Sequence, residues 1–298
     1  MSCYKPITAW RTPTGIVFNE LSRHDIRGRL DIPCNKCIGC RLRRASDWAS
    51  RISHEQKLHE QNCFITLTYA PEHIPPGHSL DYKHFQDFLK RLRAKYETPI
   101  RFYMCGEYGD ETERPHYHAC IFGLDFNDRQ PAGKGSSGEL FYDSEELTKI
   151  WGKGKVSVQD LTPETAGYCA RYIVDKLDGD MGEKQYRYTD ENTGEQKQKT
   201  PPFAKMSLKP GIGARWLNKY RKDVYQHDQL ITSKGETKRP PVYYDKLQKK
   251  HNIEQWEATA HQRELRARAA HQDNTTERLK AKEHVQLAKI QTLKRNLK

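Results

Sequence analysis

A chain of 298 residues is long enough for one large domain or for two smaller ones. Its 51 Lys and Arg against 39 Asp and Glu give a formal net charge of +12, and this excess favours a polyanionic partner such as nucleic acid. The chain contains no apolar run long enough to span a membrane, and it opens with no signal-peptide pattern. We therefore expect a soluble intracellular protein.

The N-terminal region is rich in cysteine. It holds four of the eight cysteines of the chain, which are Cys3, Cys34, Cys37 and Cys40. The last three form a C-x-x-C-x-x-C run, a spacing typical of thiolate metal sites, and Cys3 can supply the fourth ligand of a tetrahedral zinc ion. An iron–sulfur cluster and free reduced thiols remain as alternatives, although the Cys-Pro of the ferredoxin run is missing after Cys40. A disulfide is the least favoured state inside a cell.

Hydrophobic periodicity predicts the next elements. A basic helix is expected over residues 41–61, and a strand over residues 63–69. A loop at 71–78 contains the run Pro-Pro-Gly, which is incompatible with regular structure. Ser79 is then expected to cap a helix whose apolar stripe ends at Tyr96.

Two further strands are expected to form an antiparallel hairpin around the sequence His116-Tyr117-His118. Residues two apart in a strand point to the same face, so the two imidazoles lie side by side. If Glu107 on the preceding strand lies opposite His116, then Cys105 lies opposite His118 and all four side chains share that face. Two imidazoles and a carboxylate suit a catalytic Mn²⁺ or Mg²⁺, and zinc is also compatible. The alternative is a pair of structural histidines with a solvated glutamate.

The elements after the hairpin are shorter. The Gly-, Ser- and Pro-rich residues 127–138 are expected to form a mobile loop. A short helix over 145–151 and a strand over 155–159 follow. Thr162 is then expected to cap a helix that runs through Leu177, because Pro and Glu follow it in the first turn.

That helix carries Tyr168, Tyr172 and Lys176 at spacings of four residues, so the three side chains form one stripe. Tyrosines in such a position are often boundary packing residues. Beside a metal ion, however, a phenol becomes a candidate nucleophile, and a nearby ammonium group can stabilise phenolate or phosphate charge.

The composition changes after residue 179. Residues 180–202 interleave basic and aromatic side chains, which fits either single-stranded nucleic acid or an ordinary polar insertion. A glycine turn at 209–213 precedes a helix over 215–225 and allows close backbone approach, with a phosphate as one candidate partner. The basic tail from Lys249 is expected to be a helix or a disordered arm.

These elements together predict an α+β fold with a mainly antiparallel sheet and flanking helices. The composition predicts four regions. They are a Cys-rich zinc-binding region with a basic helix (1–60), a catalytic core (61–179), a basic accessory region (180–245) and a basic helical or disordered tail (246–298).

The chain resembles the HUH endonucleases, and within them the rolling-circle replication initiators of microviruses of the gokushovirus kind. His116-Tyr117-His118 matches the His-hydrophobic-His motif, and Tyr168-x-x-x-Tyr172-x-x-x-Lys176 matches the two-tyrosine motif. Residues 64–69, Phe-Ile-Thr-Leu-Thr-Tyr, look like the first motif of the family, a core strand. The motifs cover about residues 60–180 in the family's order, and the resemblance implies the ferredoxin- or RRM-like HUH nuclease core.

The resemblance also implies a mechanism. One tyrosine attacks the phosphate at a single-stranded or extruded origin, which leaves a 5′-phosphotyrosine and a free 3′-OH. A host polymerase extends that end, the second tyrosine cuts the regenerated origin, and strand transfer releases a circle. The chain has no GxxxxGK[ST] run, so a host helicase is expected to unwind the DNA in the cytoplasm of the bacterium.

Two other functions are compatible with the sequence. One is an HUH relaxase or transposase, which would transfer a strand into new DNA instead of releasing circles. The other is a zinc-dependent DNA-binding regulator without enzymatic activity, which would bind in a salt-sensitive manner and form no covalent adduct.

Overall fold

The structure is a computed structural model, and it describes residues 3–19, 25–109, 112–135, 138–175, 186–190, 193–232 and 235–292, without the side chains of 172–175. The chain divides into two compact units, and each is considered by itself. The smaller unit combines residues 1–44 with 251–295, and the larger combines residues 45–250 with 296–298. Among the described residues, no helix is both long and apolar enough to cross a membrane.

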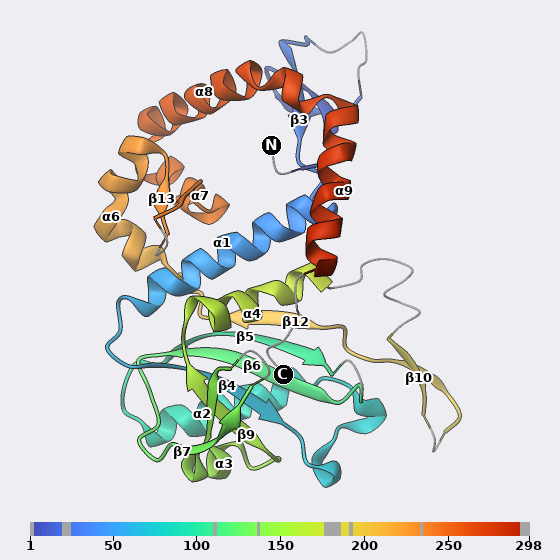
Figure 1. Cartoon of the computed structure of the whole chain (residues 1–298), viewed down its shortest axis with the longest axis vertical. Helices are drawn as coiled ribbons and strands as arrows, with labels where there is room; N and C mark the ends of the chain where they lie inside the picture. The colour runs from blue at the N-terminus through green and yellow to red at the C-terminus, as the bar shows by residue number, and fades with distance from the viewer. Residues whose placement is uncertain are drawn as a thin grey trace. The chain divides into compact units, whose positions relative to one another are not determined.

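A seven-stranded sheet organises the larger unit, and every neighbouring pair of its strands is antiparallel (Figure 1). This confirms the predicted α+β class with a mainly antiparallel sheet. The strands in spatial order are β12 (Phe203–Met206), β5 (Arg101–Tyr108), β6 (Pro115–Phe122), β4 (Asn62–Thr68), β9 (Val156–Asp160), β8 (Leu140–Asp143) and β7 (Gln130–Lys134).

One face of this sheet packs against α2 (Tyr82–Lys95) and α3 (Glu145–Trp151). The helix α2 contributes apolar side chains at helical spacing, including Phe85, Phe88 and Leu92, which meet Leu67 and Tyr117 of the central strands. Short 3₁₀ turns, η1 (Pro71–His73) and η2 (Pro76–His78), precede α2.

The predicted cap of α2 is wrong. The side chain of Asp81 caps the helix by accepting a hydrogen bond of 2.8 Å from the backbone N–H of Lys83. Ser79 lies outside the helix, and its hydroxyl accepts a hydrogen bond from the N–H of Thr200. Leu80, which was expected on the helix, is buried in the core just before it. Ser79 and Asp81 both cap helices well, so the tertiary contact of Leu80 decides where α2 begins.

The other face of the sheet packs against α4 (Pro163–Asp175) and the part of α1 (Ile38–Gln56) that belongs to the larger unit. Ile52 of α1 and Ala166 of α4 meet Phe64 and Tyr103 of the strands in this second core. Because helices cover both faces, strand β4 has buried side chains on both sides and reads as a nearly continuous apolar run.

The mobile loop expected at residues 127–138 is wrong as far as that segment is described, because it contains β7. That strand pairs with β8 at the edge of the sheet, with a register shift between Pro131 and Gly133. Its side chains are mostly exposed, so the sequence lacks the alternation by which a half-buried strand is identified.

The glycine turn before α6 (Ala214–His227) approaches a carboxylate of the protein. The N–H of Gly213 donates a hydrogen bond of 2.6 Å to Oε2 of Glu55, which is fully buried and also bonded to Arg101. Gly213 has φ 78°, and an added Cβ would lie 2.4 Å from the hydroxyl of Tyr244. The close backbone approach is therefore structural, and no phosphate is needed to explain it.

The rest of the larger unit consists of small elements. Strands β10 (Arg187–Thr189) and β11 (Gln196–Gln198) form a hairpin within the predicted accessory region. Strands β13 (Leu230–Ile231) and β14 (Thr237–Lys238) form another, followed by α7 (Val242–His251). The predicted four-region division stays a prediction, and β12, which lies beyond residue 179, belongs to the same sheet as the catalytic hairpin.

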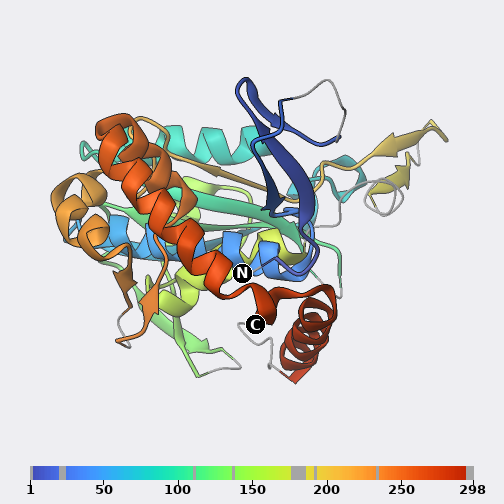
Figure 2. The same cartoon turned by 90° about the horizontal axis from the view of Figure 1, so that it is seen from above.

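The smaller unit contains a three-stranded antiparallel sheet in the order β2 (Gly15–Val17), β1 (Ile7–Thr12), β3 (Gly28–Ile32), drawn in dark blue in Figure 2. The basic tail is helical where it is described. It forms α8 (Ile253–Ala269), the 3₁₀ turn η3 (His271–Asn274) and α9 (Thr276–Thr292).

Candidate metal and nucleophile site

The hairpin of β5 and β6 has the register that the sequence predicts. Glu107 lies opposite His116, and Cys105 lies opposite His118. In an antiparallel pair, residues directly opposite each other point to the same face, which here is the face covered by α4. Each side chain therefore reaches its position from the middle or end of a regular strand.

Three polar groups surround one oxygen atom of Glu107. Its Oε1 lies 3.2 Å from Nε2 of His116 and 3.1 Å from Nε2 of His118. The hydroxyl of Tyr168, on α4, donates a hydrogen bond of 2.9 Å to the same oxygen. The candidate ligand atoms of Glu107, His116 and His118 all lie within 4.8 Å of one another.

Both imidazoles are oriented by their other nitrogen atom. Nδ1 of His118 lies 2.9 Å from Oγ1 of Thr66, and Nδ1 of His116 donates to the carbonyl oxygen of Arg114 at 3.1 Å. These partners direct both Nε2 atoms toward Glu107, as outer-sphere groups do around metal-binding histidines. The sequence analysis did not identify Thr66 as a site residue. The signal was its place in the first family motif, opposite His118 in the register of β4 and β6.

The donor set fits a divalent cation. Since the Nδ1 proton of His116 is held by a carbonyl, neutral His116 turns a lone pair toward a carboxylate oxygen. Nε2 of His118 is buried and has no well-aligned hydrogen bond, although it lies 3.1 Å from that oxygen. A cation between these atoms would satisfy two lone pairs and one negative charge. Two nitrogens and one oxygen suit Mn²⁺ or Mg²⁺ with water, and also zinc.

The charges within the site affect one another. Burial alone would raise the pKa of Glu107, but hydrogen bonds and charge from His116 and His118 hold that pKa well below its ordinary value. Burial lowers the pKa of His118, which favours the neutral imidazole that a metal ion requires. Burial and the nearby charge of Glu107 raise the pKa of Tyr168, so the phenol keeps its proton.

The tyrosine helix begins as predicted, since Oγ1 of Thr162 accepts a hydrogen bond from the N–H of Thr165. Tyr168 packs edge-to-face on Phe64 and His118. The guanidinium group of Arg171, one turn further along, lies 5.6 Å from the centre of the Tyr168 ring. The sequence analysis did not single out this cation. Tyr172 belongs to the same helix, but its side chain and the whole of Lys176 lie outside the described residues.

A lysine continues the site across the sheet. Thr68 lies opposite His116, and its N–H donates a hydrogen bond of 2.8 Å to the carbonyl of Lys155. The same register pairs Thr66 with Ser157, so the side chains of Lys155 and Ser157 belong to the face that carries the histidines. Lys155 is exposed and can contact a phosphate beside the candidate metal site. Only the strand register identifies it, because its neighbours in the sequence form no recognisable motif.

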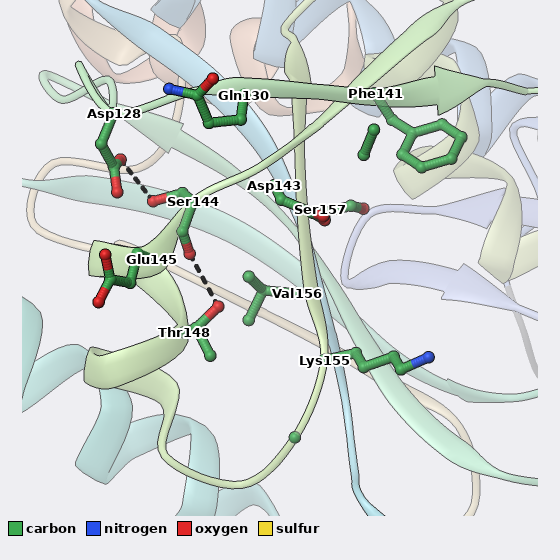
Figure 3. A pocket seen from close by; sticks show the side chains of 12 residues that line it. Asp128, Gln130, Phe141, Asp143, Ser144, Glu145, Thr148, Lys155, Val156 and Ser157 are labelled. Atoms are coloured by element: carbon green, nitrogen blue, oxygen red, sulfur yellow. Dashed lines mark hydrogen bonds between the residues drawn. The ribbon is translucent and has the colours of Figure 1, made fainter.

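A pocket of about 750 Å³ lies beside Lys155, over β7, β8, β9 and α3 (Figure 3). Its acidic wall includes Asp128, which accepts hydrogen bonds from the hydroxyl of Ser144 and the N–H of Glu146 and so stabilises the start of α3. That carboxylate is therefore engaged in structure. None of the predicted site residues lines this pocket.

The four N-terminal cysteines are also brought together, within the smaller unit. The sulfur atoms of Cys3, Cys34, Cys37 and Cys40 lie within 4.8 Å of one another, and all four cysteines are free. The sequence analysis thus grouped the correct residues, including Cys3, which is 31 residues from its nearest partner in the cluster.

Comparison with known proteins gives a consistent result. The family model of the replication-associated protein ORF2 matches residues 62–177. The chain is 32% identical over 266 residues to the replication-associated protein VP4 of Bdellovibrio phage phiMH2K, covering 86% of this chain and 80% of that protein. It is 29% identical over 269 residues to the replication-associated protein ORF2 of Spiroplasma virus 4, covering 83% and 80%.

A third relative is matched over a shorter region. This is the replication-associated protein ORF4 of Chlamydia phage 1, which is 34% identical over 154 residues, or 49% of this chain and 38% of that protein. No solved structure matches the chain.

Proposed function

The chain belongs to the phage replication-associated proteins that initiate rolling-circle replication in microviruses, and from this premise we propose that it nicks single-stranded origin DNA with a tyrosine nucleophile. The observation that carries the proposal is the position of the Tyr168 hydroxyl. It contacts the same carboxylate oxygen as two imidazole nitrogens, so the nucleophile and the candidate metal ligands converge on one point. Packing alone would not require a phenol there.

The residues of the site have separate roles in the proposed reaction. Glu107, His116 and His118 would hold a Mn²⁺ or Mg²⁺ ion, with Thr66 orienting His118. When bound, that ion supplies Lewis-acid polarisation of the scissile phosphate. The hydroxyl of Tyr168 or Tyr172 gives up its proton and forms an O–P bond, while the P–O3′ bond breaks and the 3′ oxygen takes up a proton. Arg171 and Lys176 are the cations placed to balance phenolate or phosphate charge.

The two tyrosines allow the reaction to be reversed at a second cut. The covalent link stores the phosphodiester, so rejoining needs no ATP. The free 3′-OH primes synthesis by a host polymerase, with a host helicase unwinding the duplex in the bacterial cytoplasm. When the origin is regenerated, the second tyrosine cuts it, and transfer of the first phosphate to the new 3′-OH closes a circle.

The direct test is incubation with oligonucleotides that span the origin of the phage, in Mn²⁺ or Mg²⁺, followed by a denaturing gel. We expect a covalent protein–DNA species and a free 3′-OH fragment. Replacing both His116 and His118 with Ala should abolish cleavage and leave most DNA binding, because phosphate contacts elsewhere supply affinity.

Tyr82→Phe is the matched control, since Tyr82 lies on α2 and packs on Phe203, away from the histidines. This variant should cleave normally. Salt-sensitive binding without any covalent species would favour a regulator instead of an enzyme. Strand transfer into new DNA, without release of circles, would favour a relaxase or transposase.

A further inference from the structure

The four N-terminal cysteines have the geometry of a single-ion site. The sulfur atoms of Cys3 and Cys34 are 3.6 Å apart, and those of Cys3 and Cys37 are 3.9 Å apart. With Zn–S bonds of about 2.3 Å, a tetrahedral site has S···S edges of about 3.8 Å. The observed separations lie on either side of that value. They are too long for disulfides, whose S–S distance is about 2.0 Å.

The backbone around the cluster stabilises negative sulfur. Three N–H groups donate to sulfur at 3.3 Å, namely Tyr4 to Cys37, Cys34 to Cys3, and Cys37 to Cys34. Hydrogen bonds of this kind favour thiolate over thiol and tune sulfur ligands. Asn35 has a φ of 60°, a left-handed conformation that asparagine tolerates well, within the tight turn between Cys34 and Cys37.

Two arginines add positive charge to the same turn. Arg41 donates to the carbonyl of Lys36 at 3.0 Å, and Arg44 donates to that of Asn35 at 3.1 Å. Four thiolates around one divalent ion carry a net charge of about −2, so guanidinium groups next to the turn lower the electrostatic cost of the site.

The smaller unit also lacks a substitute for a metal. Apart from cysteines, the buried apolar side chains among its described residues are those of Ala9 and Leu279. A unit with so small a core usually depends on a metal or on disulfides for its stability. The cluster lies where it is needed, because Cys3 precedes β1, Cys34 follows β3, and Cys37 and Cys40 lie at the start of α1.

We infer that Cys3, Cys34, Cys37 and Cys40 bind one structural zinc ion, which joins both ends of the β1–β3 sheet to the first turn of α1. The site is closed, since all four positions around the ion are filled by sulfur, and it has no catalytic role. A four-iron cluster does not fit, because its ligand sulfurs stand off the corners of a cube and are more widely separated than sulfurs on a single ion. The inference does not depend on the proposed nicking activity.

The test is elemental analysis of the full chain purified without chelators. We expect one zinc per chain in the wild type, in the His116→Ala/His118→Ala double variant, and in Cys63→Ser, which changes a buried thiol of β4 far from the cluster in sequence. Cys37→Ser should lose the zinc, and residues 3–44 should become sensitive to protease. The histidine variant separates this zinc from any ion at the candidate catalytic site.

A second measurement covers the case in which Cys37→Ser does not fold. Wild-type protein and Cys63→Ser are exchanged with Co²⁺, and the absorption spectrum is examined for the intense sulfur-to-cobalt transitions of tetrahedral thiolate coordination. Their presence supports the four-cysteine site. The inference is overturned by bound iron, by the absence of zinc from the wild type, by a cobalt spectrum without sulfur transitions, or by zinc that persists in Cys37→Ser and leaves the histidine variant.

Discussion

The hydroxyl of Tyr168 donates a hydrogen bond to Oε1 of Glu107, although the two residues are 61 positions apart in the chain. One lies on helix α4 and the other near the end of strand β5. The contact joins a candidate nucleophile to a candidate metal ligand. It also means that the phenol must exchange this partner before it can attack a phosphate, so changes at Glu107 should affect both metal binding and cleavage.

The first prediction concerns Glu107. Glu107→Gln keeps the shape of the side chain and removes its charge, so the Mn²⁺ concentration for half-maximal cleavage should rise by about tenfold or more. The measurement is initial cleavage rate against Mn²⁺. The control is Glu113→Gln, which changes an exposed glutamate in the same hairpin. An unchanged Mn²⁺ titration would remove Glu107 from the ligand set.

The second prediction concerns Thr66 as a positioning residue. Thr66→Val removes the hydroxyl bonded to His118 without changing side-chain volume much, so metal affinity should fall by about 10- to 100-fold. Thr66→Ser retains the hydroxyl and should restore most of that affinity. The readout is the Mn²⁺ dependence of cleavage at saturating DNA. Equal behaviour of the two variants would assign Thr66 a packing role only.

The third prediction separates the two tyrosines. Tyr168→Phe keeps the ring contacts to Phe64 and His118 and removes only the hydroxyl, so the protein should remain folded. Each single Phe variant at 168 or 172 should retain one cleavage event and fail to release circles, because its remaining tyrosine is already esterified at the second cut. The double variant should form no covalent adduct.

Those outcomes are read from adduct formation on an oligonucleotide and from circle release on a two-origin substrate. Full circle release by Tyr168→Phe at a near-normal rate would make Tyr168 a packing residue. The protein would then be a one-tyrosine enzyme, closer to the relaxases or transposases of the superfamily.

The fourth prediction concerns Lys155. If this exposed lysine contacts a phosphate next to the histidines, Lys155→Ala should weaken binding to every single-stranded sequence by a similar factor. The slope of log K against log salt concentration should become shallower by about 0.7. Lys149→Ala is the control, because Lys149 lies on α3 and pairs with Glu145 at 2.6 Å. Equal salt slopes for wild type and Lys155→Ala would exclude the phosphate contact.

The fifth prediction concerns the pH dependence of stability. His54 of α1 is buried and stacked on Trp216 with ring centres 3.5 Å apart, and burial lowers its pKa to about 3 from an ordinary value of 6.5. Its folded pKa is depressed, so the unfolded chain binds the extra proton between these values. The stability contributed by neutral His54 is fully present above pH 6.5 and is lost as the pH falls toward 3.

The measurement is the free energy of unfolding by urea at several pH values. In that window His54 should contribute a slope approaching about 1.4 kcal/mol per pH unit, and His54→Phe should remove this contribution while keeping an aromatic ring against Trp216. His73→Gln, at an exposed position, is the control and should leave the pH profile unchanged. A profile that is the same in wild type and His54→Phe would contradict the prediction.

Local spacing in the sequence was enough to identify the residues that converge. The pattern His-x-His places two imidazoles on one strand face, and a short turn sets the register that brings Glu107 opposite His116. The C-x-x-C-x-x-C run likewise groups three thiols within one turn of chain. In each case the chain segment is short and regular, so geometry follows from the period of the strand or from the reach of the turn.

The tertiary structure decided what lies between segments distant in the chain. Thr66, Lys155 and Arg171 reach the site through strand register or helix packing, and nothing near them in the sequence indicates it. The same is true of the contact between Tyr168 and Glu107, and of Gly213, whose N–H binds a buried carboxylate instead of a ligand. Contacts of this kind depend on which faces pack together, and that is set by burial of the whole core and not by any local pattern.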